Sequence, residues 1–236
     1  MRTSPSLLRV LVPYVSLLLL CSNPAQAQTS VVPNRITQRV DPQRSVTLQG
    51  NTHPLARPEF DRGAVSDAMP MGRILLLLQR SPDQEQALQQ LLEAQQTKSS
   101  PSYHAWLTPD QFGQQFGVAD ADIQLITQWL ASQGFSQINA GPGRMVIEFS
   151  GTAGQVRSAF HTEIHRFVIS GQEHTANVAD PQIPAALAPV VAGIVSLHDF
   201  PKKSHSKVLG EFRRKIGEPG LQPLLTSPNP YRAGNF

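Results

Sequence analysis

The sequence predicts an α+β fold in which helices pack on one face of an antiparallel sheet. Two observations support this class. Short apolar runs such as Ile74–Leu78 and Val190–Leu197 have the length of buried strands, and they interleave with stretches of helical periodicity. The expected neighbouring strands are also joined by connections too short for parallel crossovers, so they should pair antiparallel.

The first predicted strand is followed directly by a helix. Residues 74–79 (ILLLLQ) form a continuous apolar run that is typical of a central strand. Residues 81–84 (Ser-Pro-Asp-Gln) then supply an N-cap, a proline, an acid and a glutamine, which together indicate a helix start. The helix should run to about Gln96. Its helical spacing predicts a stripe packed on the sheet, formed by Leu88, Leu91, Leu92 and Gln95.

Two more helices are expected before the chain returns to the sheet. Residues 108–111 (Thr-Pro-Asp-Gln) repeat the start signal, and Phe112 and Phe116 follow one turn apart. Asp120 is expected to cap the next helix and Gly134 to end it. The buried stripe of that helix should comprise Ile123, Ile126, Trp129 and Leu130.

The second half of the domain should add the remaining strands and one helix. Thr152 is expected to cap that helix, and Ser170-Gly171 should form the turn of a hairpin. The predicted strands cover residues 136–140, 145–149, 163–169, 172–177 and 190–197, with an irregular link over 181–189. The order of strands and helices indicates a sandwich of the ferredoxin-like type.

Composition divides the chain into four segments. Residues 1–27 are expected to be a signal peptide, 28–70 an extended N-terminal arm rich in proline and polar residues, 71–200 the folded domain, and 201–236 a basic, flexible linker. Such a linker is also a segment where chains are commonly cut by proteases.

The N-terminus has the three parts of an export signal. Arg2 and Arg9 form a positive region, residues 7–20 an apolar region, and Ala25-Gln26-Ala27 a cleavage site that places the mature start at Gln28. The apolar run is interrupted by a proline and falls short of the ~20 residues of a membrane span, so a retained anchor is disfavoured. We therefore expect a secreted or periplasmic protein with no membrane association after signal removal.

Cysteine and charge exclude several classes of protein. Cys21 is the only cysteine and lies in the predicted signal, so no disulfide is expected; the bulky Leu20 before it disfavours a lipoprotein signal. Without Arg2 and Arg9, the 20 basic residues fall to 18, against 17 acidic ones. No basic cluster lies inside the folded region, and we therefore expect no nucleic-acid partner.

The stretch Pro101–Phe135 carries a resemblance to a known family. Its core Tyr103–Pro109 (YHAWLTP), the Phe112/Phe116 pair and the ending Trp129-Leu130…Gly134-Phe135 resemble the activation propeptide of sedolisins, which are kumamolisin-like and tripeptidyl-peptidase-like serine-carboxyl proteases. Residues 50–56 (GNTHPLA), 149–152 (FSGT) and 183–187 (IPAAL) also resemble segments of that propeptide, so that the similarity extends from about Thr52 to Asp199.

The resemblance implies a protein without catalysis of its own. Sedolisins use a serine nucleophile in a Ser-Gly-Thr-Ser motif, a glutamate base oriented by an aspartate, and an aspartate in the oxyanion hole. Residues 150–153 read Ser-Gly-Thr-Ala, so Ala153 stands where the nucleophile would be, and Thr152 is better explained as a helix cap. No catalytic residue is carried over. We expect no cofactor, because the resemblance implies that the family's calcium site lies in the catalytic domain, which this sequence is expected to lack.

Histidines are the remaining candidate functional residues. His161, His165 and His174 fall on one predicted hairpin, where Phe167 should lie opposite His174. No metal-binding motif accompanies them, so they are either solvated or interface histidines. As an alternative, His165 and His174 could sense pH at an interface, because histidine titrates near neutrality and the resemblance implies a protease that matures in acid.

The sequence thus predicts a secreted propeptide domain of a sedolisin-type serine-carboxyl endopeptidase, and the resemblance implies that it acts as folding chaperone and inhibitor. The expected partner is the protease domain, in cis or in trans. Two alternatives remain, namely a free-standing inhibitor module that acts in trans and a truncated fragment of a full protease.

Overall fold

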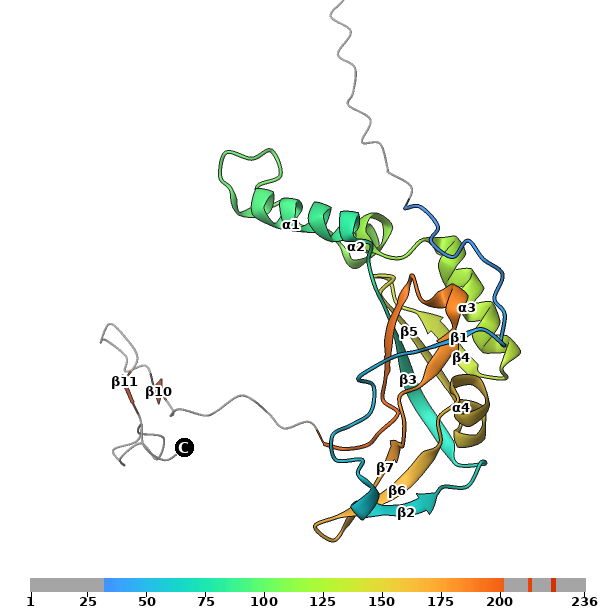
Figure 1. Ribbon diagram of the computed structural model, residues 1–236. Helices are drawn as coiled ribbons and strands as arrows, with labels where there is room; N and C mark the ends of the chain where they lie inside the picture. Colours follow the sequence, from blue (N-terminus) through green and yellow to red (C-terminus); the bar gives the residue numbers. More distant parts are fainter. Residues whose placement is uncertain (1–31, 202–211, 214–221, 224–236) are drawn as a thin grey trace, which may run out of the picture.

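The computed structural model describes residues 32–201, together with 212–213 and 222–223 (Figure 1). Its main sheet contains four strands in the order β4-β5-β3-β9, and each neighbouring pair is antiparallel. These strands are β3 (Pro70–Leu78), β4 (Ser136–Ala140), β5 (Val146–Thr152) and β9 (Val191–Val195). The connection order and the strand order are those of a ferredoxin-like sheet, so the predicted fold class is confirmed.

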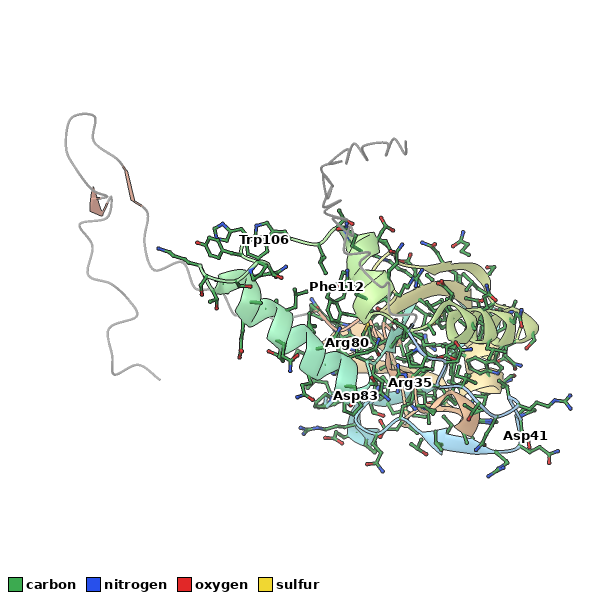
Figure 2. The ribbon with its side chains drawn as sticks, turned by 90° about the horizontal axis from the view of Figure 1, so that it is seen from above. Arg35, Asp41, Arg80, Asp83, Trp106 and Phe112 are labelled. Carbon is green, nitrogen blue, oxygen red and sulfur yellow. The ribbon has the colours of Figure 1, made fainter. Side chains whose placement is uncertain are left out.

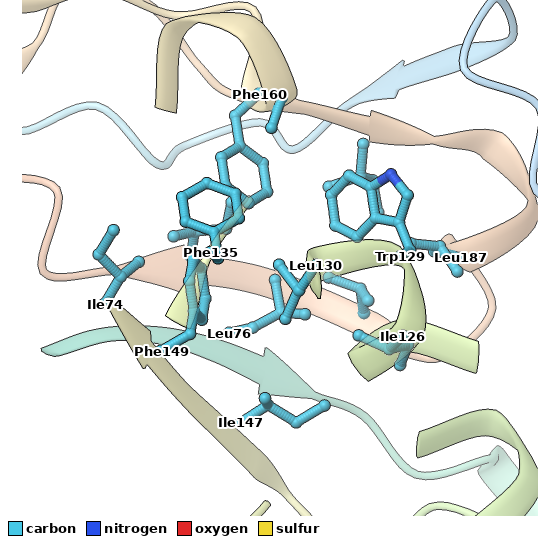
Figure 3. Packing of buried hydrophobic residues seen from close by; sticks show 14 of the residues in the cluster. Ile74, Leu76, Ile126, Trp129, Leu130, Phe135, Ile147, Phe149, Phe160 and Leu187 are labelled. Carbon is cyan, nitrogen blue, oxygen red and sulfur yellow. The ribbon is translucent and has the colours of Figure 1, made fainter. Parts of the chain in front are cut away.

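Helices cover one face of this sheet (Figure 1). The crossover from β3 to β4 contains α1 (Pro82–Gln96), α2 (Pro109–Phe116) and α3 (Asp120–Ser132), and α4 (Ala153–Phe160) follows β5. The main core lies between the sheet and the pair α3 and α4 (Figure 3). Its fully buried side chains include Ile74, Leu76, Ile126, Leu130, Ile147, Phe149 and Phe160.

Aromatic rings fill the core between α3, α4 and the sheet. The ring of Trp129 meets Phe160 edge-on, with centroids 5.5 Å apart. Phe135 makes a similar T-shaped contact with Phe149 at 4.9 Å. These geometries are the ones that aromatic quadrupoles favour, so the aromatic side chains add directional contacts to the burial of apolar surface.

The predicted helix starts are confirmed at three of four sites. Ser81, Thr108 and Thr152 each form a full capping box, in which the glutamine three residues later bonds back to the cap. The prediction that Asp120 caps α3 is wrong, because Ala119 is the cap residue and Asp120 is the first residue of the helix. Asp120 instead pairs with Arg144 at 2.9 Å, and it adds negative charge to the first turn of α3.

The prediction that the leucine stripe of α1 packs on the sheet is also wrong. Figure 1 shows α1 projecting away from the sheet. Leu88 is buried, but Leu92 is 45% exposed. The helix packs against α2 and the loop between them, where Gln84 Nε2 donates to the carbonyl of Gly117 and Gln95 Nε2 to that of Ala105. A helical period identified an amphipathic helix but could not identify the surface that its apolar face contacts.

A second, three-stranded sheet lies below the first in Figure 1. It consists of β2 (Asp61–Ala64), β6 (Ile164–Ile169) and β7 (Gln172–Asn177) in the order β2-β6-β7. The hairpin turn falls at Ser170 and Gly171 as predicted, and both residues have positive φ, as a type I′ turn requires.

The N-terminal arm is joined to the domain more closely than its composition suggested. Within it, β1 (Ser45–Thr47) pairs with β8 (Gln182–Pro184), a short strand inside the link that was predicted to be irregular. Two 3-10 turns, η1 (Pro58–Phe60) and η2 (Ala185–Leu187), and the strand pair β10 (Phe212–Arg213) and β11 (Gln222–Pro223) complete the elements. The predicted signal peptide lies outside the described residues, as does nearly all of the predicted C-terminal linker.

Two buried acceptors hold the arm in place. The carboxylate of Asp122 on α3 is fully buried and accepts the backbone N–H groups of Arg35 and Ile36, at 2.8 and 3.0 Å. Further along, Asn51 Oδ1 accepts the N–H of Ile194, which satisfies a donor at the edge strand β9. Among the described residues, no helix is long and apolar enough to cross a membrane.

Replacing Asp122 should therefore detach the start of the arm. In Asp122→Ala, the buried N–H of Ile36 and the partly buried N–H of Arg35 lose their acceptor, which should lower the free energy of unfolding by about 1–3 kcal/mol. Asp122→Asn keeps one carbonyl oxygen and should lose less. Urea unfolding measures both values, and equal losses in the two variants would contradict the assigned role of the carboxylate.

Candidate functional site

The face of the main sheet opposite α3 and α4 is a candidate interaction surface. Side chains of β3 alternate, so Ile74 and Leu76 enter the core while Leu75 and Leu77 reach the other face. There Leu75 lies between Glu148 and Val195, and Leu77 between Val146 and Gly193. We call Leu75, Leu77, Val146, Glu148 and Val195 the open face.

The open face is apolar at its centre and polar along one side. Leu75 and Leu77 are half-buried, and Val195 is 39% exposed. Toward β4, Glu148 pairs with the exposed Arg73 at 3.4 Å, a surface contact that contributes little to stability. An apolar centre with a polar border is the composition of a protein–protein interface rather than that of a small-molecule pocket.

A second exposed feature lies in the loop between α1 and α2. The rings of Tyr103 and His104 stack with centroids 3.8 Å apart, and His104 stacks in turn on Trp106 at 5.6 Å. Trp106 is 62% exposed, and Figure 2 shows it near the end of α1 that points away from the sheet. The sequence singled out this loop by its family resemblance, but only the structure shows that its tryptophan lies outside the core.

The two predicted histidine sites lie on the hairpin formed by β6 and β7. The predicted register is confirmed, with Phe167 opposite His174. The structure does not join His165 and His174 into one site, because each contacts its own carboxylate. His161 is exposed at the end of α4, where its backbone is left-handed with φ 50°.

His165 lies between two carboxylates. Its Nδ1 is 2.8 Å from the carboxylate of Asp61 on β2, and its Nε2 is 3.2 Å from that of Glu163. Burial acts to lower the pKa of His165, but the hydrogen bonds and charges of Glu163 and Asp61 outweigh it and raise the pKa above its usual 6.5. The pKa of Asp61 lies below its usual 3.8: burial opposes this shift, whereas hydrogen bonds from Gly63 and His165 and the histidine's charge produce it.

His174 contacts the segment that follows β9. Its Nδ1 is 3.3 Å from Asp199 Oδ1, and the same oxygen accepts the backbone N–H of Thr175 at 2.8 Å. The backbone N–H of Asp199 donates in return to the carbonyl of Thr175. Asp199 therefore fastens the end of the domain to β7 by backbone and side-chain contacts.

Residues 150–153, which resemble a sedolisin nucleophile motif in letters, form the turn from β5 into α4. Ser150 Oγ donates to the side-chain oxygen of Gln137 and accepts the backbone N–H of Arg73. Thr152 caps α4, as the sequence predicted. The contacts of this turn are those of a strand-to-helix connection.

Within the described part of the chain, no group of three His, Asp or Glu side chains is arranged to hold a metal ion. The carboxylate partners of the histidines were missed by sequence reasoning. Asp61 and Asp199 lie far along the chain from the histidines they contact. The pairing of β2 with β6 brings Asp61 to His165, and the segment after β9 brings Asp199 to His174.

An α+β domain with one covered sheet face and one open face is suited to packing against another protein. Residues 61–200, more than half of the chain, match the family model described as "Pro-kumamolisin, activation domain". The chain belongs to this family, which confirms the resemblance to sedolisin propeptides.

Two curated relatives support the same assignment. The chain is 33% identical over 165 residues to xanthomonalisin of Xanthomonas sp. (strain T-22) and 30% identical over 127 residues to sedolisin of Pseudomonas sp. (strain 101). These alignments cover 67% and 54% of this chain but only 20% and 22% of the relatives. The chain therefore matches about a fifth of the length of each relative.

The contact between Asp61 and His165 should stabilise the domain only within a window of pH. A histidine whose pKa is higher in the folded state than in the unfolded state stabilises the fold at pH values below its unfolded pKa of about 6.5. This stabilisation is lost as the pH rises through the pKa of the folded state. For Asp61, whose folded pKa is lowered, the contribution is present above about 3.8 and is lost as pH falls through the folded value. The window of stabilisation thus extends from a pH below 3.8 to a pH above 6.5.

The test compares the unsubstituted chain with His165→Gln by urea unfolding at several pH values. The difference in unfolding free energy should be largest inside the window and shrink as the pH is raised above it. His161→Gln, which alters an exposed histidine of the same region, should show no such dependence. A difference that grows toward alkaline pH would contradict the assignment.

Proposed function

We propose that this chain is the activation propeptide of a sedolisin-type serine-carboxyl endopeptidase, which guides the folding of the protease domain and inhibits it. The family membership supports the propeptide role, and the two relatives carry the names of sedolisin-type proteins. The open face is the structural observation that carries the proposal, because it offers the protease an apolar docking surface.

The open face suits this role for a physical reason. Leu75 and Leu77 lie on β3, which is paired on both sides by β5 and β9, so the surface is rigid before it meets a partner. A preorganised surface loses little conformational entropy on docking, and it can serve as a template for a less ordered partner. The segment from residue 201 onward would then lie along the active-site cleft and block it.

The proposal includes export. Cleavage between Ala27 and Gln28 would release a secreted or periplasmic domain, as the charged, apolar and small-residue regions of the N-terminus indicate. N-terminal sequencing of the exported chain should begin at Gln28. A mature protein that begins at Met1 would contradict this part of the proposal.

A second candidate function is inhibition in trans by a free-standing module. The open face is compatible with it, because an apolar docking surface can bind a protease on a separate chain as well as one on the same chain. The genomic sequence after the codon for Phe236 distinguishes three possibilities: a propeptide that acts in cis, an inhibitor that acts in trans and a fragment of a full protease. If the sequence after Phe236 encodes a domain with a Ser-Gly-Thr-Ser motif, the chain is a propeptide that acts in cis or a fragment of a full protease. If an intact protease is encoded by a separate gene, the chain is an inhibitor that acts in trans.

The docking role predicts a specific pattern of inhibition. Purified residues 28–236 should inhibit mature xanthomonalisin, and the double variant Leu75→Gln/Leu77→Gln should raise the inhibition constant at least about tenfold by removing apolar contact. Leu125→Gln is the control, because Leu125 is an exposed leucine on α3, on the covered side of the sheet. It should inhibit like the unsubstituted chain.

Thermal unfolding of all three proteins checks that the substitutions leave the fold intact. Equal inhibition by the double variant and the control would show that the open face is not the docking surface. Peptidase activity of the purified chain itself at acid pH would contradict the propeptide role.

A further inference from the structure

Three histidines from three parts of the chain converge on Phe200. His53 of the N-terminal arm stacks on the Phe200 ring with centroids 4.3 Å apart and planes at 22°. His174 of β7 lies 4.7 Å from the same ring, and His198 lies 5.8 Å from it. His53 and His198 are themselves 4.6 Å apart. The cluster therefore joins the arm, the hairpin and the end of the domain.

Phe200 is also the last residue of the family match, and we call His198–Phe200, at this end of the described domain, the chain exit. Its side chain is only 6% exposed and belongs to a small apolar cluster with Phe167 and Ala176, separate from the main core. The adjoining Asp199 is bonded to Thr175 through its backbone N–H and its side chain. A small cluster at a chain exit opens more readily than the main core.

The hydrogen bonding of His53 identifies its neutral form. Its Nδ1 accepts the backbone N–H of Leu55 at 3.2 Å, so the ring proton must sit on Nε2. A second proton can bind only at Nδ1, which would then no longer accept this hydrogen bond. The N–H of Leu55 and the new N–H of the ring would face each other as two donors. Protonation of His53 would therefore remove this hydrogen bond from the packed form of the cluster.

Burial and a neighbouring histidine also oppose protonation of His53. Asp199 contacts His174, and Arg166 and Glu173 line the same surface hollow as these two residues. Burial, and then the charge of His174, lower the pKa of His53 below its usual 6.5. A charged imidazole stacked on Phe200 would gain some cation–π attraction, but this opposing effect leaves the direction of the shift unchanged.

We propose that His53, His174 and His198 form an acid-sensitive latch on Phe200, which holds the chain exit against the domain at neutral pH and releases it when His53 is protonated. A histidine whose pKa is lower in the folded state than in the unfolded state stabilises the fold at pH values above its unfolded pKa. This stabilisation is lost as the pH falls through the pKa of the folded state. His165 on the same hairpin has the opposite response, so acid frees the chain exit while it strengthens the contact between β2 and β6. The latch is a property of this chain alone and does not depend on the proposed function.

The test measures hydrogen exchange in residues 28–236, at the backbone amide of Asp199, which donates to Thr175. Protection factors, corrected for the intrinsic effect of pH, should fall at least about threefold between about pH 7.5 and pH 5. His53→Gln removes the titrating ring and should abolish this fall. His161→Gln, outside the cluster, should retain it. Unchanged protection in the unsubstituted chain, or the same fall in His53→Gln, would overturn the latch.

A second measurement needs no substitution and thus no assumption about folding of the variant. Histidine ring protons followed by NMR should give His53 a midpoint below 6.5, and the loss of Asp199 protection should follow that midpoint. A loss that follows the titration of His165 or His161 instead would overturn the assignment to His53.

Discussion

The position of β3 between β5 and β9 is the constraint on which the other features depend. Because both edges of this strand are paired, its alternation fixes which side chains enter the core and which reach the open face. A shift of one residue would exchange Leu76 for Leu75 or Leu77 and place the core leucines in solvent. The helices α3 and α4 cover one face, and the open face lies on the other side of the sheet (Figure 1).

Local sequence signals predicted local structure well. The capping boxes at Ser81, Thr108 and Thr152 and the turn at Ser170-Gly171 depend on residues a few positions apart, which a sequence displays directly. Contacts between distant segments could not be predicted in this way. The surface that α1 packs against, and the burial of Asp122 beneath the arm, depend on the tertiary arrangement.

In the candidate sites, too, local structure could be predicted from the sequence, but contacts between distant segments could not. The turn predicted at Ser170-Gly171 placed Phe167 opposite His174, and the structure confirmed that register. The function of each histidine, however, depends on its non-local neighbours. Two carboxylates contact His165 and favour its charged form, whereas burial, a second histidine and a backbone N–H favour the neutral form of His53. Residue type alone would assign both the same response to acid, and the contacts assign them opposite ones.

The central claim is that the open face docks against a sedolisin-type protease. Hydroxyl-radical footprinting of residues 28–236, free and mixed with mature xanthomonalisin, tests it most directly, because it reports the exposure of individual side chains. The account predicts that oxidation of Leu75, Leu77 and Val195 falls in the complex while that of Leu125 on α3 is unchanged. Protection of Leu125 with unchanged oxidation of the open face, or no complex at all, would contradict it.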